Sequence, residues 1–304
     1  MIKRVLSYTQ KILPLHGYQK AVYFFFYAAL HQKEFTRWFD FIETNLPDGF
    51  SEELKIGLAL RGAFRFVRAR LTLTQRLDIL IAYYTTITQS FSKAGISTFF
   101  GNSGLQLSEL TGRSGKKYFM KMTSFISKEG TFRIMLSEPE KTPRLASISG
   151  IIGVDKDGQR VLWVGSLQGA MSYTEKLTAT EGRQAVVEAT KDLNGLRPKQ
   201  AVLQAICSLA LWFDVKTVIA PSYQNQIAIK NFFKGQKIHT EYDAFWEEYT
   251  GSATDSYGDY CLTLPLPRRQ LADVQQKRRK DWQLRYARID ALSSDIAESL
   301  KSLQ

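Results

Sequence analysis

Cysteine and histidine are scarce in this chain of 304 residues. The sequence contains 2 cysteines, Cys207 and Cys261, and 3 histidines that lie far apart. So few cysteines exclude a disulfide framework and favour a reducing compartment. The histidines have neither a companion cysteine nor an HExxH spacing, so the sequence predicts no metal site.

Long apolar runs are also missing. The strongest one, AVYFFFYAAL from Ala21 to Leu30, has about half of the ~20 residues that a membrane span needs. The segment from Met1 to Val22 carries lysines and arginines but no apolar core followed by a small-residue cleavage site. We therefore expect neither a transmembrane helix nor a signal peptide.

Acidic residues are too few to balance the basic ones. Lysine and arginine number 41 against 29 acids, which leaves a net charge of +12 and a pI near 9.5. This excess predicts an anionic partner, either a phosphate-bearing small molecule, a lipid surface or a nucleic acid. Nucleic acid ranks last, because no recognition-helix signature, zinc spacing or aromatic-basic RNA motif accompanies the charge.

The first third of the chain has helical periodicity. Apolar residues recur at helical spacing from Tyr18 to Phe91, and the Leu46 to Gly49 break precedes Ser51, a candidate N-cap. Thr72 or Thr74 is the candidate cap of the helix that ends near Phe91. This pattern predicts a helical N-terminal region over residues 1–94.

Arginines cluster near the end of this region. Arg61, Arg65 and Arg68 are spaced by four and three residues, which predicts one shared helix face, and Arg70 follows. Such a face either meets solvent or contacts an anionic ligand or lipid.

Strand-forming patterns dominate from Gly95 onward and predict turns and short strands. An Asp-Gly pair in VDKDG, residues 154–158, lies between two β-forming runs and indicates a hairpin. An antiparallel meander is therefore expected to lead into the segment from Val161 to Ser222. That segment reads as a strand, a polar loop at Thr190 to Gln200, an apolar helix and a buried strand, the order of a parallel unit.

The loop before the apolar helix predicts an anion site. Gly195 permits a positive φ angle and Pro198 suits the first helical position, so the N–H groups of Lys199, Gln200 and Ala201 would point outward. The alternative is an ordinary proline-started helix with solvated charges. The candidate ligand-binding residues are Gly165, Gln168, Gly169, Lys191, Asn194, Gly195, Arg197, Lys199 and Gln200.

The last third combines aromatic, acidic and basic residues. A helix is expected from Tyr223 to Phe233, a strand from Tyr260 to Leu266, and a basic helix from Arg268 to Arg288. The aromatic-acidic cluster at Tyr242 to Tyr249 either shapes a pocket or belongs to the core. Candidate acids and bases in this part are Tyr223, Tyr242, Asp243 and Glu247.

Several long motifs in this chain resemble the bacterial VirK/YbjX family. They are GSLQG (165–169), TKDLNGLRPK (190–199), YDAFWEEYTG (242–251), and LP followed by QQKRRKDWQLRYARID near the end. The resemblance covers about Leu71 to Leu292. Where the family has a histidine in one helix, this chain has Ala82 before Tyr83, so no role for such a histidine carries over.

The resemblance implies a setting rather than a reaction. Family members are linked to virulence, to surface display of an outer-membrane virulence protein, and to resistance against cationic antimicrobial peptides in Gram-negative bacteria. A cytoplasmic location is expected, including peripheral contact with the inner membrane.

From these patterns we predict an α/β (α+β) fold with a mixed sheet similar to that of the GNAT acetyltransferases. The expected divisions are a helical region (1–94), a mixed-sheet domain (95–267) and a basic C-terminal helix packed on it (268–304). One hypothesis is an acyltransferase that uses coenzyme A or acyl-coenzyme A and modifies an envelope component. The other is a non-catalytic adaptor that binds anionic lipid or a partner protein. The sequence does not predict an oligomeric state.

Overall fold

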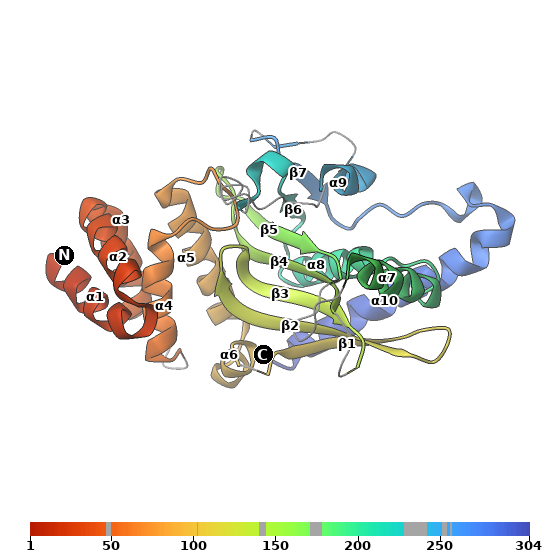
Figure 1. Ribbon diagram of the computed structural model, residues 1–304, viewed down its shortest axis with the longest axis horizontal. Helices are drawn as coiled ribbons and strands as arrows, with labels where there is room; N and C mark the ends of the chain where they lie inside the picture. The colour runs from red at the N-terminus through yellow and green to blue at the C-terminus, as the bar shows by residue number, and fades with distance from the viewer. Residues whose placement is uncertain are drawn as a thin grey trace.

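An N-terminal group of helices adjoins a seven-stranded sheet with further helices around it (Figure 1). The computed structural model describes residues 1–46, 50–101, 103–139, 144–170, 178–227, 242–250, 254–255 and 257–304. The mixed α/β class and the helical N-terminal region predicted from the sequence are therefore confirmed.

The helices are α1 (Ile2–His16), α2 (Tyr18–Leu30), α3 (Gln32–Thr44), α4 (Glu52–Ala63), α5 (Leu73–Ser90), α6 (Lys93–Phe99), α7 (Ala179–Asp192), α8 (Pro198–Trp212), α9 (Asp243–Thr250) and α10 (Arg279–Lys301). Short 3-10 turns are η1 (Tyr223–Asn225), η3 (Leu271–Asp273) and η4 (Gln276–Arg278). The strands are β1 (Leu105–Thr111), β2 (Lys117–Ser127), β3 (Gly130–Ser137), β4 (Arg144–Val154), β5 (Arg160–Gln168), β6 (Thr217–Ala220) and β7 (Tyr260–Thr263).

Side-chain caps start two of the N-terminal helices. Ser51 accepts the Leu54 N–H at 3.2 Å and begins α4. Thr72 begins α5 and forms a reciprocal pair of hydrogen bonds with Gln75, which satisfies donors that the first helical turn leaves unpaired. Both positions agree with the predicted caps, and Thr72 is used instead of Thr74.

The strands follow one another across the sheet in chain order, β1 to β7. Neighbouring strands are antiparallel except for β5 and β6, which are parallel, as the strand-helix-strand order predicted. The predicted hairpin joins β4 and β5, and Gly158 takes a φ of +77° in its turn. That angle favours glycine.

Helices cover both faces of β4. Ten consecutive residues of this strand are buried, which requires packing on both sides. Gly150 approaches Ile206 of α8, whereas Gly153, three residues on and thus on the other face, approaches Ile79 of α5. The central strand is therefore enclosed between the N-terminal helices and α8.

The predicted arginine face is wrong. Helix α4 ends at Ala63, and the chain then takes an irregular path on which Val67 has a φ of +62°. Arg61 and Arg68 are buried, while Arg65 and Arg70 are exposed. Two of the four cations therefore lie inside the protein.

Four other elements differ from the expected ones. The passage after Gly95 begins inside α6 and reaches strand only at Leu105. Helix α7 occupies the first part of the region expected as a loop, and the C-terminal helix begins at Arg279, after the turns η3 and η4. The predicted helix from Tyr223 to Phe233 is a short 3-10 turn as far as Asn225, and its remainder from 228 lies outside the described residues.

No helix within the described ranges combines the length and apolar character that crossing a membrane requires.

Candidate functional site

Among the residues that the structure describes, the last part of strand β5 has no strand partner on the edge that faces β6. It pairs with β6 only at Leu162↔Val218 and Trp163↔Ile219, yet it continues to pair with β4 as far as Gln168. Beyond Trp163 the two parallel strands therefore separate. The freed edge lies at the carboxyl end of β5, where ligands commonly bind between diverging parallel strands.

Tyr242 closes part of this edge. It is buried and lies immediately before α9, with its ring stacked on Trp246 at a centroid distance of 6.4 Å. Its hydroxyl accepts a hydrogen bond from the backbone N–H of Leu167. Burial, together with the charge of Glu129, raises the pKa of Tyr242 to about 12, although the hydrogen bond from Leu167 favours the ionised form. The phenol is thus protonated at neutral pH and can donate a proton.

Glu129 organises the other side of the strand end. Ser166 donates to its Oε2 at 2.7 Å, and Gln168 Nε2 donates to its Oε1 at 3.2 Å. Arg133 contacts the same carboxylate at 3.2 Å. The carboxylate is brought here by the tight turn between β2 and β3, whose backbone crosses Gly165 so closely that a Cβ there would overlap Glu129. Gly165 therefore has a packing role.

Two arginines complete this polar cluster. Arg144 donates to Gln168 Oε1 at 2.8 Å, and Arg133 Nε donates to Ser149 Oγ at 3.1 Å. Gln168 thus bridges a carboxylate and a guanidinium, which fixes the orientation of its amide.

The N-terminus of α8 adjoins the same strand end. Lys199 is half-buried, and its Cε lies 3.8 Å from the position that a Cβ on Gly169 would occupy. Burial and the nearby charge of Arg197 lower the pKa of Lys199. A cation that is partly desolvated beside a helix N-terminus is suited to an anionic group.

Arg197 and Gln200 face α9. Arg197 forms an ion pair with Glu248, in which both side chains are nearly half exposed. Its backbone N–H donates to Gln200 Oε1 at 3.3 Å, and Gln200 also hydrogen-bonds Tyr249. This side of the helix start is therefore occupied by protein contacts.

Helix α10 forms hydrogen bonds with the turn at Asn194 and Gly195. Both residues have positive φ, +55° and +78°, as expected for Gly195. The Gly195 N–H donates to Thr190 O at 2.7 Å, so it is not available to a ligand. Arg285 donates to the Asn194 carbonyl at 3.3 Å, and Arg288 donates to the Asn194 side chain. Part of the predicted basic face of the tail thus contacts protein.

The remaining candidates lie apart from this cluster. Lys191 is exposed in the last turn of α7. The Asp243 carboxylate accepts the Tyr223 backbone N–H at 2.8 Å, and exposed Glu247 accepts the Tyr260 hydroxyl at 3.2 Å. Of the four predicted acids and bases, Tyr242 is the one whose hydroxyl bonds β5.

Comparison with known proteins identifies the family. The family described as "Protein of unknown function (DUF535)" matches residues 15–298. The chain belongs to the DUF535 family. It is 31% identical over 236 residues to the protein YbjX of Escherichia coli K12, an alignment that covers 76% of this chain and 68% of YbjX. The resemblance to the VirK/YbjX family is thereby confirmed.

Two proteins of Haemophilus influenzae are more distant relatives of this DUF535 chain. One is 29% identical over 45% of this chain and 43% of its own length, and the other is 31% identical over 39% of each. No solved structure matches the chain.

Several residues of the site in this DUF535 chain were not predicted from its sequence. Glu129 lies in the turn between β2 and β3, Arg133 in β3 and Arg144 in β4, all before the motifs from which the site was predicted. Helix α7 was also not predicted, although a local signal for its start was present. Thr178 and Glu181 have the spacing of a capping box, and they do begin this helix. Nothing local marks Glu129, because its role arises from the way in which the sheet folds.

Proposed function

We propose that this chain transfers an acyl group from acyl-coenzyme A to a component of the cell envelope. The observation that carries the proposal is the separation of β5 from β6, with Tyr242 on the opened edge and Lys199 at its end. In acetyltransferases of the GNAT type, a comparable opening admits the pantetheine arm, and the following helix start holds the pyrophosphate.

In this arrangement Lys199 would bind a phosphate oxygen, supported by the helix dipole of α8. The chain lacks the closely spaced glycines of the usual acetyltransferase loop, and the Gly195 N–H is already used. Side-chain cations therefore replace part of the backbone cradle. Arg197 could join them by exchanging its exposed partner Glu248 for phosphate.

The reaction follows from the two protonatable groups at the strand end. The acceptor's hydroxyl or amine attacks the thioester carbonyl, and its proton passes to the Glu129 carboxylate. The carbon–sulfur bond then breaks, and Tyr242 protonates the departing thiolate. A base that takes the proton of the acceptor and an acid that protonates the leaving thiolate are the two roles of general acid–base catalysis in acyl transfer.

A biological role in virulence is proposed from the family resemblance. Modification of an envelope component would connect the chemistry with surface display of outer-membrane virulence proteins and with resistance to cationic antimicrobial peptides. Coenzyme A would be the donor carrier.

Thermal melting with coenzyme A, acetyl-coenzyme A and a long-chain acyl-coenzyme A tests the donor site. Ligand at ~100 times its dissociation constant stabilises by roughly 2.7 kcal/mol, a shift on the order of 5 to 10 °C. Lys199→Met and Arg197→Ala should reduce the shift, whereas Lys216→Met, which changes a largely exposed lysine, should keep it. No shift, or equal shifts in all variants, would refute the donor site.

A further inference from the structure

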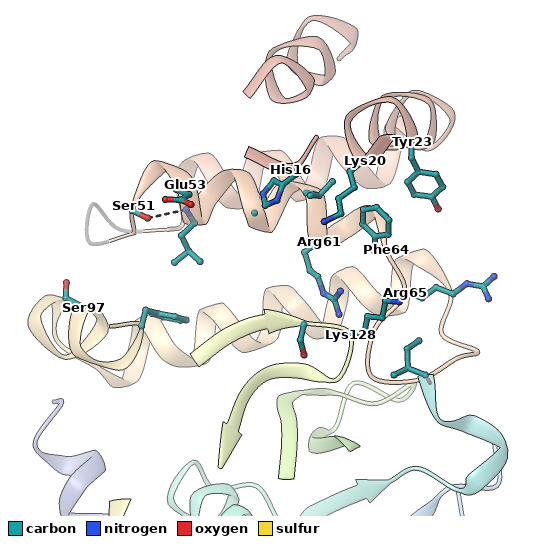
Figure 2. Close-up of a pocket in the computed structure, with 16 residues that line it drawn as sticks. His16, Lys20, Tyr23, Ser51, Glu53, Arg61, Phe64, Arg65, Ser97 and Lys128 are labelled. Carbon is teal, nitrogen blue, oxygen red and sulfur yellow. Dashed lines mark hydrogen bonds between the residues drawn. The ribbon is translucent and has the colours of Figure 1, made fainter. Parts of the chain in front are cut away.

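A second candidate site lies between the N-terminal helices and the sheet. It is a cavity of about 1190 Å³ to which α1, α2, α4, α6 and the β2–β3 turn contribute (Figure 2). This volume exceeds that of most small-molecule pockets. Figure 2 shows Arg61 pointing from α4 toward the sheet, with His16 and Lys20 on the helical side.

Arg61 is the unusual residue of this cavity. Its side chain is 6% exposed, and within the described part of the chain its Nε and Nη2 have no hydrogen-bond partner. The guanidinium lies over Phe66 at 4.5 Å from the ring centre. Burial and the nearby charge of Arg76 lower the pKa of Arg61 to about 9, so it is still charged at neutral pH. A buried cation without a counter-charge is costly unless something pairs with it.

The other charged groups of the cavity do not provide that pairing. Lys20, Arg65 and Lys128 add positive charge, and Glu53 is the one carboxylate among the lining residues that the structure describes. The buried His16 Nε2 atom likewise has no hydrogen-bond partner among the described residues, and burial lowers the pKa of this ring. The cavity therefore carries an excess of cations around a desolvated centre, as an anion-binding site does.

Three serines, Ser51, Ser97 and Ser127, also line the cavity, and most of its other uncharged lining residues are apolar or aromatic. The apolar and aromatic residues are Tyr23, Leu54, Leu60, Phe64, Phe100 and Ile227. An inorganic anion would leave these surfaces in contact with water, whereas a molecule with an acidic head and a hydrocarbon tail would cover them. The lining thus favours an amphiphile.

Exposed apolar residues on α2 lead to the same cavity. Phe26 is 61% exposed and Leu30 80% exposed, and both share a helix face with Tyr23, which also lines the cavity. Tyr18, at the start of α2, is 72% exposed. Large apolar side chains beside a basic opening are typical of a surface that enters the lipid interface.

We propose that this cavity binds a phosphate-bearing lipid, with the phosphate at Arg61 and the acyl chain along Leu54, Leu60 and Phe100, and that α2 contacts the membrane from which the lipid comes. The site does not depend on the acyl-transfer proposal, because its residues are distinct from those at the end of β5. The β2–β3 turn nevertheless contributes to both, with Lys128 in the cavity and Glu129 at the strand.

Calorimetric titration with soluble dihexanoyl phosphatidate, dihexanoyl phosphatidylcholine and inorganic phosphate tests the binding. Phosphatidate should bind more tightly than either of the others. Arg61→Gln should weaken it about tenfold or more, the effect of losing a hydrogen bond between charged groups. Lys128→Gln, which changes an exposed side chain of the lining, should weaken it less. Arg70→Gln is the matched control, since Arg70 is exposed and does not line the cavity.

Flotation with phosphatidylcholine vesicles containing phosphatidate tests the membrane contact. Wild-type protein should float, and the Phe26→Ser/Leu30→Ser variant should float less while still binding soluble phosphatidate. Equal binding of phosphate and phosphatidate would overturn the lipid assignment. Phosphatidate binding that Arg61→Gln and Lys128→Gln leave unchanged would overturn the site.

Discussion

Two buried arginines, seven residues apart, have opposite surroundings. Arg68 is 2% exposed and forms ion pairs with Asp259 and, at 2.7 Å, with Asp255. Arg61 is similarly buried and also lies over an aromatic ring, but no carboxylate pairs with it among the described residues. The first guanidinium is part of the folded framework. The second is available to a ligand.

The surroundings of Arg68 explain why it is structural. Asp259 also accepts hydrogen bonds from the Ser222 N–H at 3.0 Å and from Asn225 at 2.7 Å. Burial raises the pKa of Asp259, although Arg68 and these donors favour its ionised form. The network ties the segment after α4 to the end of β6. Its residues therefore join the helical region to the sheet.

Removing the paired arginine should have the largest effect on stability. Arg68→Met leaves Asp259 buried without its counter-charge, and breaking a buried pair in this way costs about 3–5 kcal/mol. Urea unfolding measures the loss. Arg197→Ala is the control, because its ion pair is exposed and the substitution should change the free energy of unfolding by about 1 kcal/mol or less. Similar results for the two variants would contradict the structural role of Arg68.

Tyr242→Phe should have the next largest effect, on activity. Loss of the proton donor should lower the rate of acyl transfer about 100-fold, within the range for general acids, with little change in acyl-coenzyme A binding. Tyr260→Phe removes a hydroxyl that bonds exposed Glu247 and serves as the control. An unchanged rate in Tyr242→Phe would remove Tyr242 from the mechanism.

Asp192→Asn should have a smaller, pH-dependent effect. Although burial raises the pKa of Asp192, hydrogen bonds from the Ser114 N–H and the Tyr118 hydroxyl lower it overall. Its stabilising contribution is therefore present above the unfolded pKa of about 3.9 and is lost as pH falls through the lower folded value. We expect the variant to lose about 1 kcal/mol at pH 7.

The pH series provides the check on that assignment. Unfolding of wild type and Asp192→Asn should be compared between pH 7 and pH 2.5. The two free energies of unfolding should converge in acid. A difference that grows as pH falls would show that the carboxylate is not the favoured form.

Arg61→Met should have the smallest effect on stability. It removes an unpaired buried charge and keeps an apolar chain over Phe66, so the free energy of unfolding should be unchanged or higher by about 1 kcal/mol. The comparison of its free energy of unfolding with that of Arg68→Met distinguishes the unpaired arginine from the paired one most clearly. A loss as large as that of Arg68→Met would mean that Arg61 is a structural residue as well.

Local patterns predicted much of the fold. Neighbouring residues predict the caps at Ser51 and Thr72 and the turn at Gly158. The order of strand, helix and strand predicts the parallel pairing of β5 with β6. The burial of Arg68 could not be predicted in this way, because its partner Asp259 is 191 residues away in the chain. Spacing alone cannot show that a helix ends at Ala63.

The candidate site was predicted only in part, because some of its residues are local features and others come from distant parts of the chain. The strand end at Gln168 and Gly169 and the helix start at Lys199 are local features, and the structure brings them together. Glu129 lies about forty residues earlier and reaches them only through the turn between β2 and β3. Asn194 was predicted as a ligand residue, yet α10 occupies its polar groups.

Hydrogen–deuterium exchange with and without acetyl-coenzyme A tests the donor site most directly. We expect slower exchange at residues 164–170 of the β5 end and at 199–201 of α8, with no change at the cavity residues 53–65. Slower exchange confined to the cavity, or none at the end of β5, would contradict the assignment of that strand as the acyl-donor site.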